Sequence, residues 1–502
     1  MNRLISKLRE MRQVGGAIRT SGLPDEAIEA FAATHPELGE AIDAAHAAYL
    51  ELQSARADFL HLDENEQIHR VQAGFVNFYP DDAVNPYVAL AARGPWLVTL
   101  KGAVVHDSGG YGMLGFGHAP AAVLEALAGR QVMANVMTPS VSQLRFVEGL
   151  QREIGHRRGG SPYTRFFCLN SGSEAMTLAS RIADINAKRM TDPGARHAGR
   201  TIKRLAVKGS FHGRTEGPAA FSDSSRKAYV ENLASYRNDD SLLTVEPYDV
   251  GQLRQAFTDA DRNGWFIQAM FLEPVMGEGD PGRAVTREFY LAARELTRAH
   301  GALLLVDSIQ AGLRAHGVLS FVDYPGFEDV DPPDLETYSK ALNAGQFPLS
   351  VLAALPATAE LYRKGVYGNT MTTNPRALDG ACAVLDLLTP GVRANIRARG
   401  EEFLAKLERL RAELPDCITK VQGTGLLFSC ELAPVFKCYG TGSTEEWLRE
   451  HGFGVIHGGA NSLRFTPPFT ITGAEVDLLV DGLRRALVEG PRQRADATRA
   501  AA

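Results

Sequence analysis

Residues 302–310 read ALLLVDSIQ, and they contain the clearest strand signal in the sequence. Its uninterrupted apolar run, in place of an alternating pattern, is typical of a strand buried on both faces of a largely parallel sheet. Asp307 follows at the carboxyl end of that strand, where open α/β sheets bind their ligands. A carboxylate there can hold a positive charge on a ligand, although an aspartate that caps the next helix is an equally good interpretation of Asp307 alone. The stretch therefore predicts an α/β sheet with a ligand site at its edge.

Similar apolar runs recur along the chain, and helical segments separate them. Those helices supply the crossovers that a mostly parallel sheet needs, so the expected architecture is α/β. After about residue 376 the pattern returns to helix and then to strand-like pieces such as GLLFSCEL, and the last helix begins with a capping box of Thr472 and Glu475. The runs are RFFCL (165–169), LAV (205–207), AMFLEPV (269–275), ALLLVD (302–307) and LSVLAAL (349–355).

These patterns predict two α/β parts after a helical leader. The leader has no catalytic signature, but Ile42, Ala45, Tyr49 and Leu52 share one face of a helix in it. We expect it to be an accessory element that covers an entrance or a subunit contact. The expected parts are the leader with part of a small domain (1–105), a large ligand-binding α/β domain (106–376), the C-terminal part of a small α+β domain (377–489) and a disordered tail (490–502).

Composition narrows the class of protein. The 502 residues carry a formal net charge of −6, which argues against a large nucleic-acid footprint, because that needs a basic face. The five cysteines are scattered and form no C-x-x-C pair, so neither a zinc site nor a disulfide framework is expected. No apolar stretch approaches the ~20 residues that span a bilayer. The basic N-terminus favours a solvated helix over a weak organelle-targeting segment, so we expect a cytoplasmic protein with reduced cysteines and no bound metal.

Two further motifs carry chemistry. The run 165–169 leads into Asn170-Ser171-Gly172-Ser173-Glu174-Ala175, where backbone N–H groups at the start of a helix suit a phosphate, with a plain serine N-cap as the competing interpretation. Lys340 ends an apolar segment beside a Gly-containing turn. Most lysines are solvated surface charges, but a desolvated amine can attack an aldehyde. A phosphate cradle, a strand-end aspartate and a strand-flanked lysine, in this order, are what pyridoxal 5′-phosphate (PLP) requires.

In this combination the chain resembles the class III (ornithine/ω-amino-acid type) aminotransferases, which are PLP-dependent enzymes of fold type I. The resemblance runs from roughly residue 84 to residue 488. It implies a mostly parallel central sheet flanked by helices, with a smaller α+β domain built from the N- and C-terminal parts. GSFHGRT and GEGD are similar to the lysine ε-aminotransferase branch. The motifs stand in family order: NSGSEA, FHGRT, EPVMGEG, VDSIQAG, SKAL, GNTMTTNP and LRFTPPF.

The resemblance implies a role for each residue around the cofactor ring. Lys340 would bind the aldehyde as a Schiff base and later move a proton between substrate and cofactor. Asp307 would pair with the pyridine nitrogen and keep it protonated. Gln310 would contact the ring hydroxyl, and Ile309 and Phe211 would pack on the two ring faces.

Further cofactor contacts are implied at the phosphate and beneath the ring. Ser171, Gly172 and Ser173 would hold the phosphate, together with Thr370 of the partner subunit. The active unit would therefore be a homodimer with shared active sites. His212 and Glu273 complete the expected set, although a packed or hydrogen-bonded histidine is the favoured interpretation of His212.

The resemblance also implies three substrate contacts. Arg464 in LRFTPPF would hold the substrate α-carboxylate, and Glu278 in EPVMGEG would neutralise that arginine when the bound substrate presents no carboxylate there. Tyr111 would line the pocket. Two residues depart from the family pattern: Ser308 stands where an acidic residue usually follows the strand-end aspartate, and Met276 stands where glutamine is frequent.

Three functions are compatible with these residues. The leading one is a ping-pong aminotransferase that moves the terminal amine of an ω-amino or diamino acid, such as lysine, ornithine or 4-aminobutyrate, to a 2-oxo acid, for which we expect 2-oxoglutarate. The runner-up is a PLP-dependent racemase, epimerase or aminomutase, which shares the motifs but needs no 2-oxo acid. The third is a non-catalytic relative, for which Ser308 is the sole support.

Overall fold

The computed structural model describes residues 2–109, 111–133 and 136–493, and these form two compact units. Unit 1 comprises the described parts of Met1–Pro120, Ala398–Gln422 and Phe428–Ala502, and unit 2 comprises those of Ala121–Arg397 and Gly423–Leu427. The sequence patterns put the limits of the large domain at 106 and 376, whereas the main segment of unit 2 runs from 121 to 397. From residue 494 onward, the expected disordered tail lies outside the described residues.

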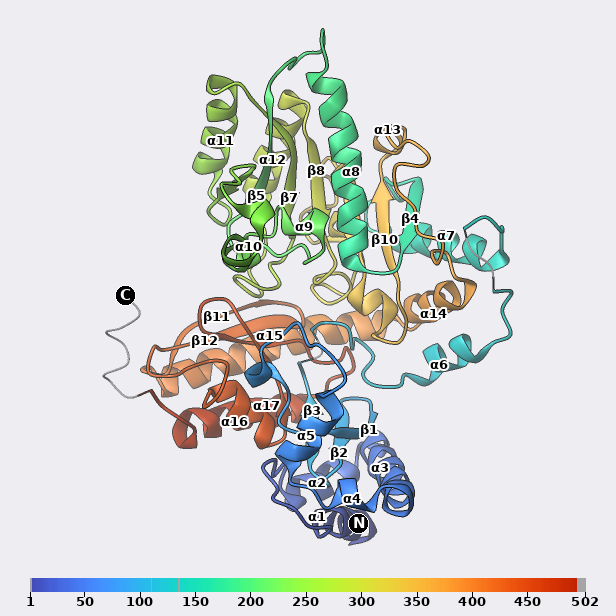
Figure 1. Ribbon diagram of the computed structural model, residues 1–502, viewed down its shortest axis with the longest axis vertical. Helices are drawn as coiled ribbons and strands as arrows, with labels where there is room; N and C mark the ends of the chain where they lie inside the picture. Colours follow the sequence, from blue (N-terminus) through green and yellow to red (C-terminus); the bar gives the residue numbers. More distant parts are fainter. Residues whose placement is uncertain (1, 110, 134–135, 494–502) are drawn as a thin grey trace. The chain divides into compact units, whose positions relative to one another are not determined.

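A seven-stranded sheet forms the centre of unit 2 (Figure 1). Five neighbouring strands run parallel to one another, and β10 is antiparallel to both of its neighbours. The expected mostly parallel sheet is therefore confirmed. In spatial order the strands are β4 (Arg165–Leu169), β10 (Ser350–Ala354), β9 (Leu335–Tyr338), β8 (Leu303–Asp307), β7 (Trp265–Leu272), β5 (Thr201–Val207) and β6 (Leu242–Val245).

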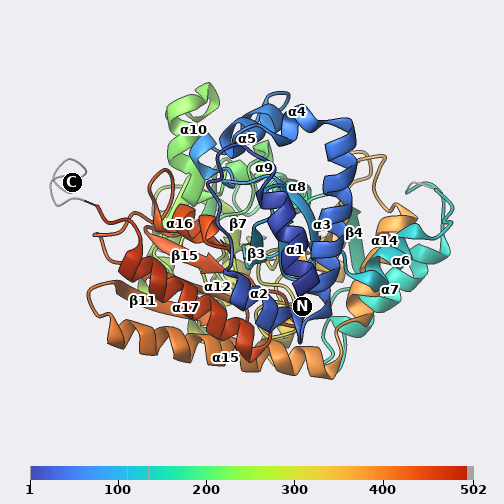
Figure 2. The ribbon, with the colours of Figure 1, turned by 90° about the horizontal axis from the view of Figure 1, so that it is seen from below.

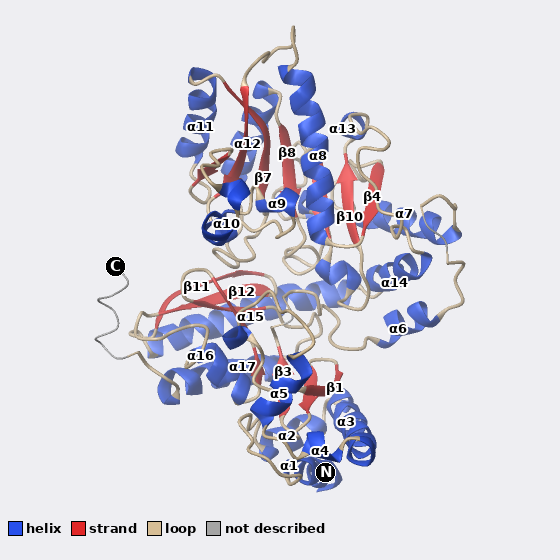
Figure 3. Ribbon diagram, in the orientation of Figure 1, coloured by secondary structure: helices blue, strands red, loops and turns tan. Residues whose placement is uncertain are grey.

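The strands β7 and β8 are mostly apolar because helices cover both faces of the sheet (Figure 3). Along β7, Ala269 and Phe271 belong to the core cluster that contains residues of α8 (Gly172–Thr191). Met270 and Leu272 belong to the cluster on the opposite face, which contains residues of α11 (Val250–Arg262) and α12 (Arg287–His300). Side chains alternate between the faces of a strand, so two covered faces require a continuous apolar run.

The apolar runs do not predict every strand of this sheet. The strand β9 is short, and Glu336 and Thr337 lie inside it, so it does not read as an apolar run. The strand β6 has only one fully buried residue, Val245, because it lies at the edge of the sheet. The sequence also does not predict the direction of each strand, because nothing in LSVLAAL indicates that β10 is antiparallel to its neighbours.

Most of the remaining elements of unit 2 are helices that connect the strands or flank the sheet. They are α6 (Ala121–Ala128), α7 (Val141–Glu153), α9 (Glu216–Ala219), α10 (Arg226–Asn232), α13 (Pro356–Ala359), α14 (Pro375–Asp386) and the 3₁₀ turns η2 (Asp223–Ser225), η3 (Ala234–Tyr236), η4 (Phe321–Asp323) and η5 (Lys340–Asn343). The boundary between the units falls within α15 (Pro390–Glu413).

Unit 1 contains two four-stranded sheets and their helices. The first sheet has the order β1 (Ala89–Arg93), β2 (Trp96–Thr99), β3 (Val104–Asp107) and β13 (Phe453–Gly454). The second has the order β11 (Ile418–Thr424), β12 (Leu427–Leu432), β15 (Ser462–Phe465) and β14 (Ile456–Gly458). The helices are α1 (Asn2–Arg12), α2 (Asp25–Ala32), α3 (Pro36–Ala55), α4 (Ala57–Leu60), α5 (Glu64–Gln72), α16 (Thr444–Glu450) and α17 (Gly473–Glu489), with the 3₁₀ turn η1 (Asp81–Ala83).

The helical leader packs inside unit 1. The helices α1 and α3 lie side by side (Figure 2), and Lys7 Nζ is 2.6 Å from Asp43 Oδ1 between them. The expected helix face is confirmed, since Ile42, Ala45 and Tyr49 are buried. This face of α3 packs near β1 and β2. The leader is therefore part of the small unit.

The last helix, α17, begins as its sequence predicts. Thr472 accepts a hydrogen bond from Glu475 N at 3.3 Å, and Glu475 Oε2 accepts from Thr472 N at 2.7 Å, which closes the capping box. In the part of the chain that the structure describes, no helix combines the length and the apolar composition needed to cross a membrane.

Candidate active site

The carboxyl end of β8 presents Asp307 to a buried histidine. Asp307 Oδ2 lies 2.7 Å from His212 Nδ1, and both side chains are buried. Asp307 Oδ1 accepts hydrogen bonds from Ile309 N and Thr337 Oγ1, each at 3.1 Å. Three partners therefore fix the orientation of this carboxylate. A helix-capping role does not describe Asp307, because the residues that follow it form turns.

Lys340 begins η5, and Ser339 alone separates it from the end of the neighbouring strand β9. Its φ of +46° lies in the left-handed region, which a lysine adopts rarely and at a cost of about 1–3 kcal/mol. The side chain is half-buried, and Nζ donates a hydrogen bond to Gln310 Oε1. The turn after β8 and the turn after β9 thus bring their functional side chains together.

The start of α8 adds the NSGSEA segment to the same site. Ser171 is the N-cap of α8, and its Oγ accepts a hydrogen bond from Glu174 N at 3.2 Å. The serine N-cap that the sequence offered as an alternative is therefore present. A Cβ at Gly172 would lie 2.7 Å from Ile309 Cδ1, and one at Gly213 would lie 2.4 Å from Ser173 Oγ. Glycine is needed at both positions because the three motifs approach so closely.

Glu273, which follows β7, is a second buried carboxylate. It accepts hydrogen bonds from Phe211 N at 3.1 Å and from Gly277 N at 2.9 Å. Burial raises the pKa of Glu273 to about 7; the nearby His212 opposes the shift and Asp307 adds to it. Glu273 therefore titrates near neutral pH.

Unit 1 carries the cluster that contains Arg464. This residue lies on β15, is buried, and places its guanidinium carbon 5.8 Å from the centre of the Tyr111 ring. Tyr79 stacks on Tyr111 with 5.9 Å between ring centres. Burial and the neighbouring Tyr79 hydroxyl raise the pKa of Tyr111. Sequence reasoning did not single out Tyr79, and a tyrosine among turn residues gave no signal for it.

Glu278 has a partner that the sequence did not predict, and Thr370 stands beside a residue that binds the start of α8. Glu278 lies 3.7 Å from Arg214, whose guanidinium stands 5.1 Å from the centre of the Phe211 ring. Thr370 is exposed, and the neighbouring Asn369 donates to Glu174 Oε1 at 3.0 Å. Glu278 and Arg464 belong to different units, so their expected pairing stays a prediction.

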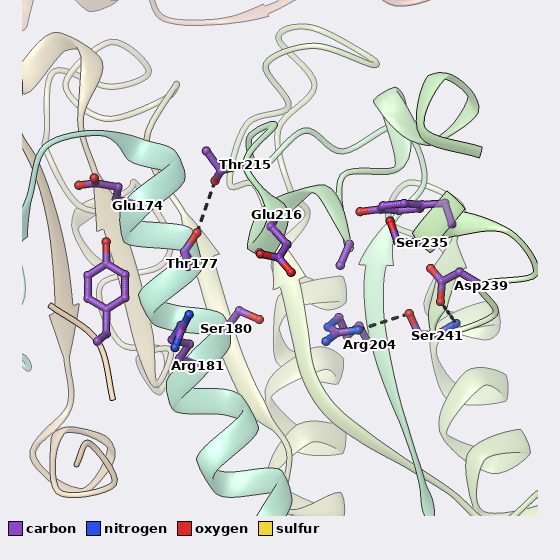
Figure 4. Close-up of a pocket in the computed structure, with 14 residues that line it drawn as sticks. Glu174, Thr177, Ser180, Arg181, Arg204, Thr215, Glu216, Ser235, Asp239 and Ser241 are labelled. Atoms are coloured by element: carbon purple, nitrogen blue, oxygen red, sulfur yellow. Dashed lines mark hydrogen bonds between the residues drawn. The ribbon is translucent and has the colours of Figure 1, made fainter. Parts of the chain in front are cut away.

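A separate pocket of about 610 Å³ runs along α8 in unit 2 (Figure 4). Lys340, Asp307 and Gln310 do not line it. Two arginines and three carboxylates face it together, so its charge does not favour an anion over a cation. The charged lining residues are Arg181, Arg204, Glu174, Glu216 and Asp239.

Comparison with known proteins identifies the family of this chain. The model of the family "Aminotransferase class-III" matches residues 78–487. The chain belongs to this family. Acetylornithine aminotransferase of Mycobacterium leprae (strain TN) is 32% identical over 400 residues, which cover 77% of this chain and 89% of that protein.

Solved structures agree on the fold. The ornithine aminotransferase from Toxoplasma gondii ME49 superposes with a TM-score of 0.71 at 24% identity, covering 87% of this chain and 98% of that one. The N-acetylornithine aminotransferase from Stenotrophomonas maltophilia K279a has a TM-score of 0.64 at 25% identity, covering 84% and 98%. The chain is therefore a PLP-dependent class III aminotransferase with the fold type I architecture.

The residues of unit 2 fit PLP. A lysine amine, a carboxylate held by a histidine and a helix N-terminus lined by small residues are the groups that bind its aldehyde, its pyridine nitrogen and its phosphate. Gln310 Nε2 is a buried donor without a hydrogen-bond partner among the described residues. The hydroxyl group on the PLP ring would satisfy this donor by accepting a hydrogen bond from it.

Proposed function

We propose that this aminotransferase moves the terminal amine of an ω-amino or diamino acid to 2-oxoglutarate in two half-reactions. The observation that carries the proposal is the buried Arg464 against the Tyr111 ring, a cation suited to holding the α-carboxylate of the 2-oxo acid. The similar proteins support a donor of this class, because they are named acetylornithine and ornithine aminotransferases.

The chain's own residues have distinct tasks in this reaction. When bound, PLP supplies the electron sink for amino-group exchange. Lys340 Nζ holds the cofactor at rest and then moves a proton at the substrate carbon, while its partner Gln310 steadies it. Asp307, oriented by His212 and Thr337, keeps the pyridine nitrogen protonated. Ser171, Gly172 and Ser173 hold the phosphate at the start of α8, and Ile309 and Phe211 enclose the ring.

The active unit in this proposal is a homodimer. The exposure of Thr370 supports a contribution to the partner's site. Exposed apolar side chains near the start of α7 are consistent with a surface that a second subunit covers. Val132, Val141 and Leu144 are 72%, 68% and 59% exposed. Clustered apolar side chains of this kind mark interaction sites more often than solvent-facing surface. We also propose a cytoplasmic location, which the free thiols of all five cysteines support.

A donor screen tests the substrate class. N-acetylornithine, ornithine, lysine and 4-aminobutyrate are each incubated with the holoenzyme and either 2-oxoglutarate or pyruvate, and glutamate or alanine is measured. We expect glutamate from a terminal amine and parallel double-reciprocal plots. Arg464→Gln should raise KM for 2-oxoglutarate by roughly tenfold or more, because a charge-assisted bidentate contact to its α-carboxylate is lost. Transfer restricted to 2-amino groups would contradict the proposal.

A racemase, epimerase or aminomutase is the second candidate, since the lysine–aspartate–phosphate set serves all of these reactions. The same holoenzyme is incubated with each amino acid and no 2-oxo acid. An isomerised product that accumulates through many turnovers would replace amino transfer as the function. A product limited to one equivalent per active site supports the two half-reactions.

A further inference from the structure

The strand β9 carries a fully buried carboxylate, Glu336, that none of the roles above uses. Its Oε1 accepts from Ser308 Oγ at 2.6 Å and from Phe321 N at 2.8 Å. Its Oε2 accepts from Ser320 Oγ at 2.6 Å and from Tyr163 OH at 3.0 Å. Four donors on two oxygens match the capacity of an ionised carboxylate, which only accepts.

Burial raises the pKa of Glu336, and the hydrogen bonds from Ser308, Ser320 and Phe321 oppose that shift. Such a network is stable when every member is satisfied, and removing one partner is costly. A carboxylate kept here at this cost needs a task that an apolar side chain could not perform.

Ser308 connects this network to the cofactor site. It stands between Asp307 and Ile309 in the turn that also carries Gln310. Its N donates to Thr337 O at 3.1 Å, and its side chain points to Glu336 on the next strand. The opposite side of the same turn is held by Thr337 Oγ1 and His212 on Asp307. The turn is thus fixed from both faces of β9, by Thr337 on one and by Glu336 on the other.

An acidic residue usually follows the strand-end aspartate in class III enzymes, and this chain has serine there. The structure brings Glu336 to that serine from the adjacent strand, so a carboxylate is still hydrogen-bonded at the turn.

We propose that Glu336 is a positioning residue that, through Ser308, holds the turn 307–310 in the geometry that binds PLP. The inference rests on the proposed function, because it takes the cofactor contacts of Asp307, Ile309 and Gln310 from it.

A double-mutant cycle tests whether Glu336 acts through Ser308. Apo-protein of the wild type, Ser308→Ala, Glu336→Gln and the double variant is titrated with PLP, and the dissociation constant and visible spectrum are recorded. We expect each single change to weaken PLP binding by roughly five- to tenfold, the range for losing one hydrogen bond. The double variant should be no weaker than the weaker single variant, because the two residues form one link.

Ser320→Ala is the matched control, since it removes a bond of the same 2.6 Å length from the same carboxylate but away from the turn. It should lower the stability of the apo-protein to urea while PLP affinity stays within about twofold. Equal losses of PLP affinity in Ser308→Ala and Ser320→Ala, or additive losses in the cycle, would overturn the inference. A wild-type enzyme that binds PLP but transfers no amino group would instead refute the proposed function alone.

Discussion

Lys340 combines the proposed chemistry with backbone strain. Its φ of +46° lies in the left-handed region, and its Nζ donates a hydrogen bond to Gln310 Oε1. Strain of this kind persists only where the surroundings fix it, and β9 and η5 do so here. The order of motifs around Lys340 predicts that it binds PLP, but the sequence contains no signal for its φ, because the conformation depends on residues far along the chain.

Glu273 shows at the same scale how burial sets a pH response. Its folded pKa of about 7 lies above the ordinary value of 4.5, so between these values the folded state keeps a proton that the unfolded state has released. Stability therefore falls as pH rises through this window, by an amount on the order of 1–3 kcal/mol. We predict that urea unfolding of the apo-protein shows this fall, and that Glu273→Gln reduces it.

The test compares the unfolding free energies of wild type and Glu273→Gln at about pH 5 and about pH 8. The variant should gain relative to the wild type at the higher pH. A difference between the two proteins that is the same at both values would show that Glu273 does not titrate in this range.

The elements were predictable to the extent that their signals are local. The capping box of α17 and the apolar run of β8 depend on neighbouring residues, and the structure confirms both. The strand β9 was not predicted because a glutamate such as Glu336 is typical of a surface position. The four hydrogen-bond donors that allow Glu336 to be buried come from residues 163, 308, 320 and 321, so the sequence next to Glu336 does not reveal them. Partners such as Asp307 for His212 were likewise set by the sheet, not by spacing.

The contact between α8 and the turn after β8 gives a prediction at this scale. Gly172→Ala would place a Cβ 2.7 Å from Ile309 Cδ1 and displace the side chain proposed to pack on the cofactor ring. We expect weaker PLP binding, measured by titration of the apo-protein. Gly39→Ala in α3 is the control, because its Cβ would meet only Leu4 Cδ1 at 3.8 Å.

The control substitution should stabilise the protein by about 0.5–1 kcal/mol, since alanine favours a helix interior over glycine, and should leave PLP affinity unchanged. If Gly172→Ala binds PLP as the wild type does, Ile309 has room to move and the proposed packing on the ring is wrong.

At the scale of the whole molecule, shared active sites predict complementation between inactive subunits. Lys340→Ala lacks the lysine, and Thr370→Arg blocks the phosphate of the partner. A mixed dimer holds one intact site, so random exchange of the two variants should restore about a quarter of the wild-type activity. Activity is measured after mixing under conditions that allow subunit exchange, with each variant alone as control. Two variants that stay inactive although mass spectrometry shows mixed dimers would place Thr370 outside the partner's site.

The attachment of PLP to Lys340, as proposed for this class III aminotransferase, can be tested directly. The holoenzyme is reduced with borohydride, digested, and its peptides are sequenced by mass spectrometry. We predict a phosphopyridoxyl group on Lys340, and no such peptide from Lys340→Ala. The same group on another lysine of the wild-type protein, with Lys340 unmodified, would show that Lys340 does not carry PLP.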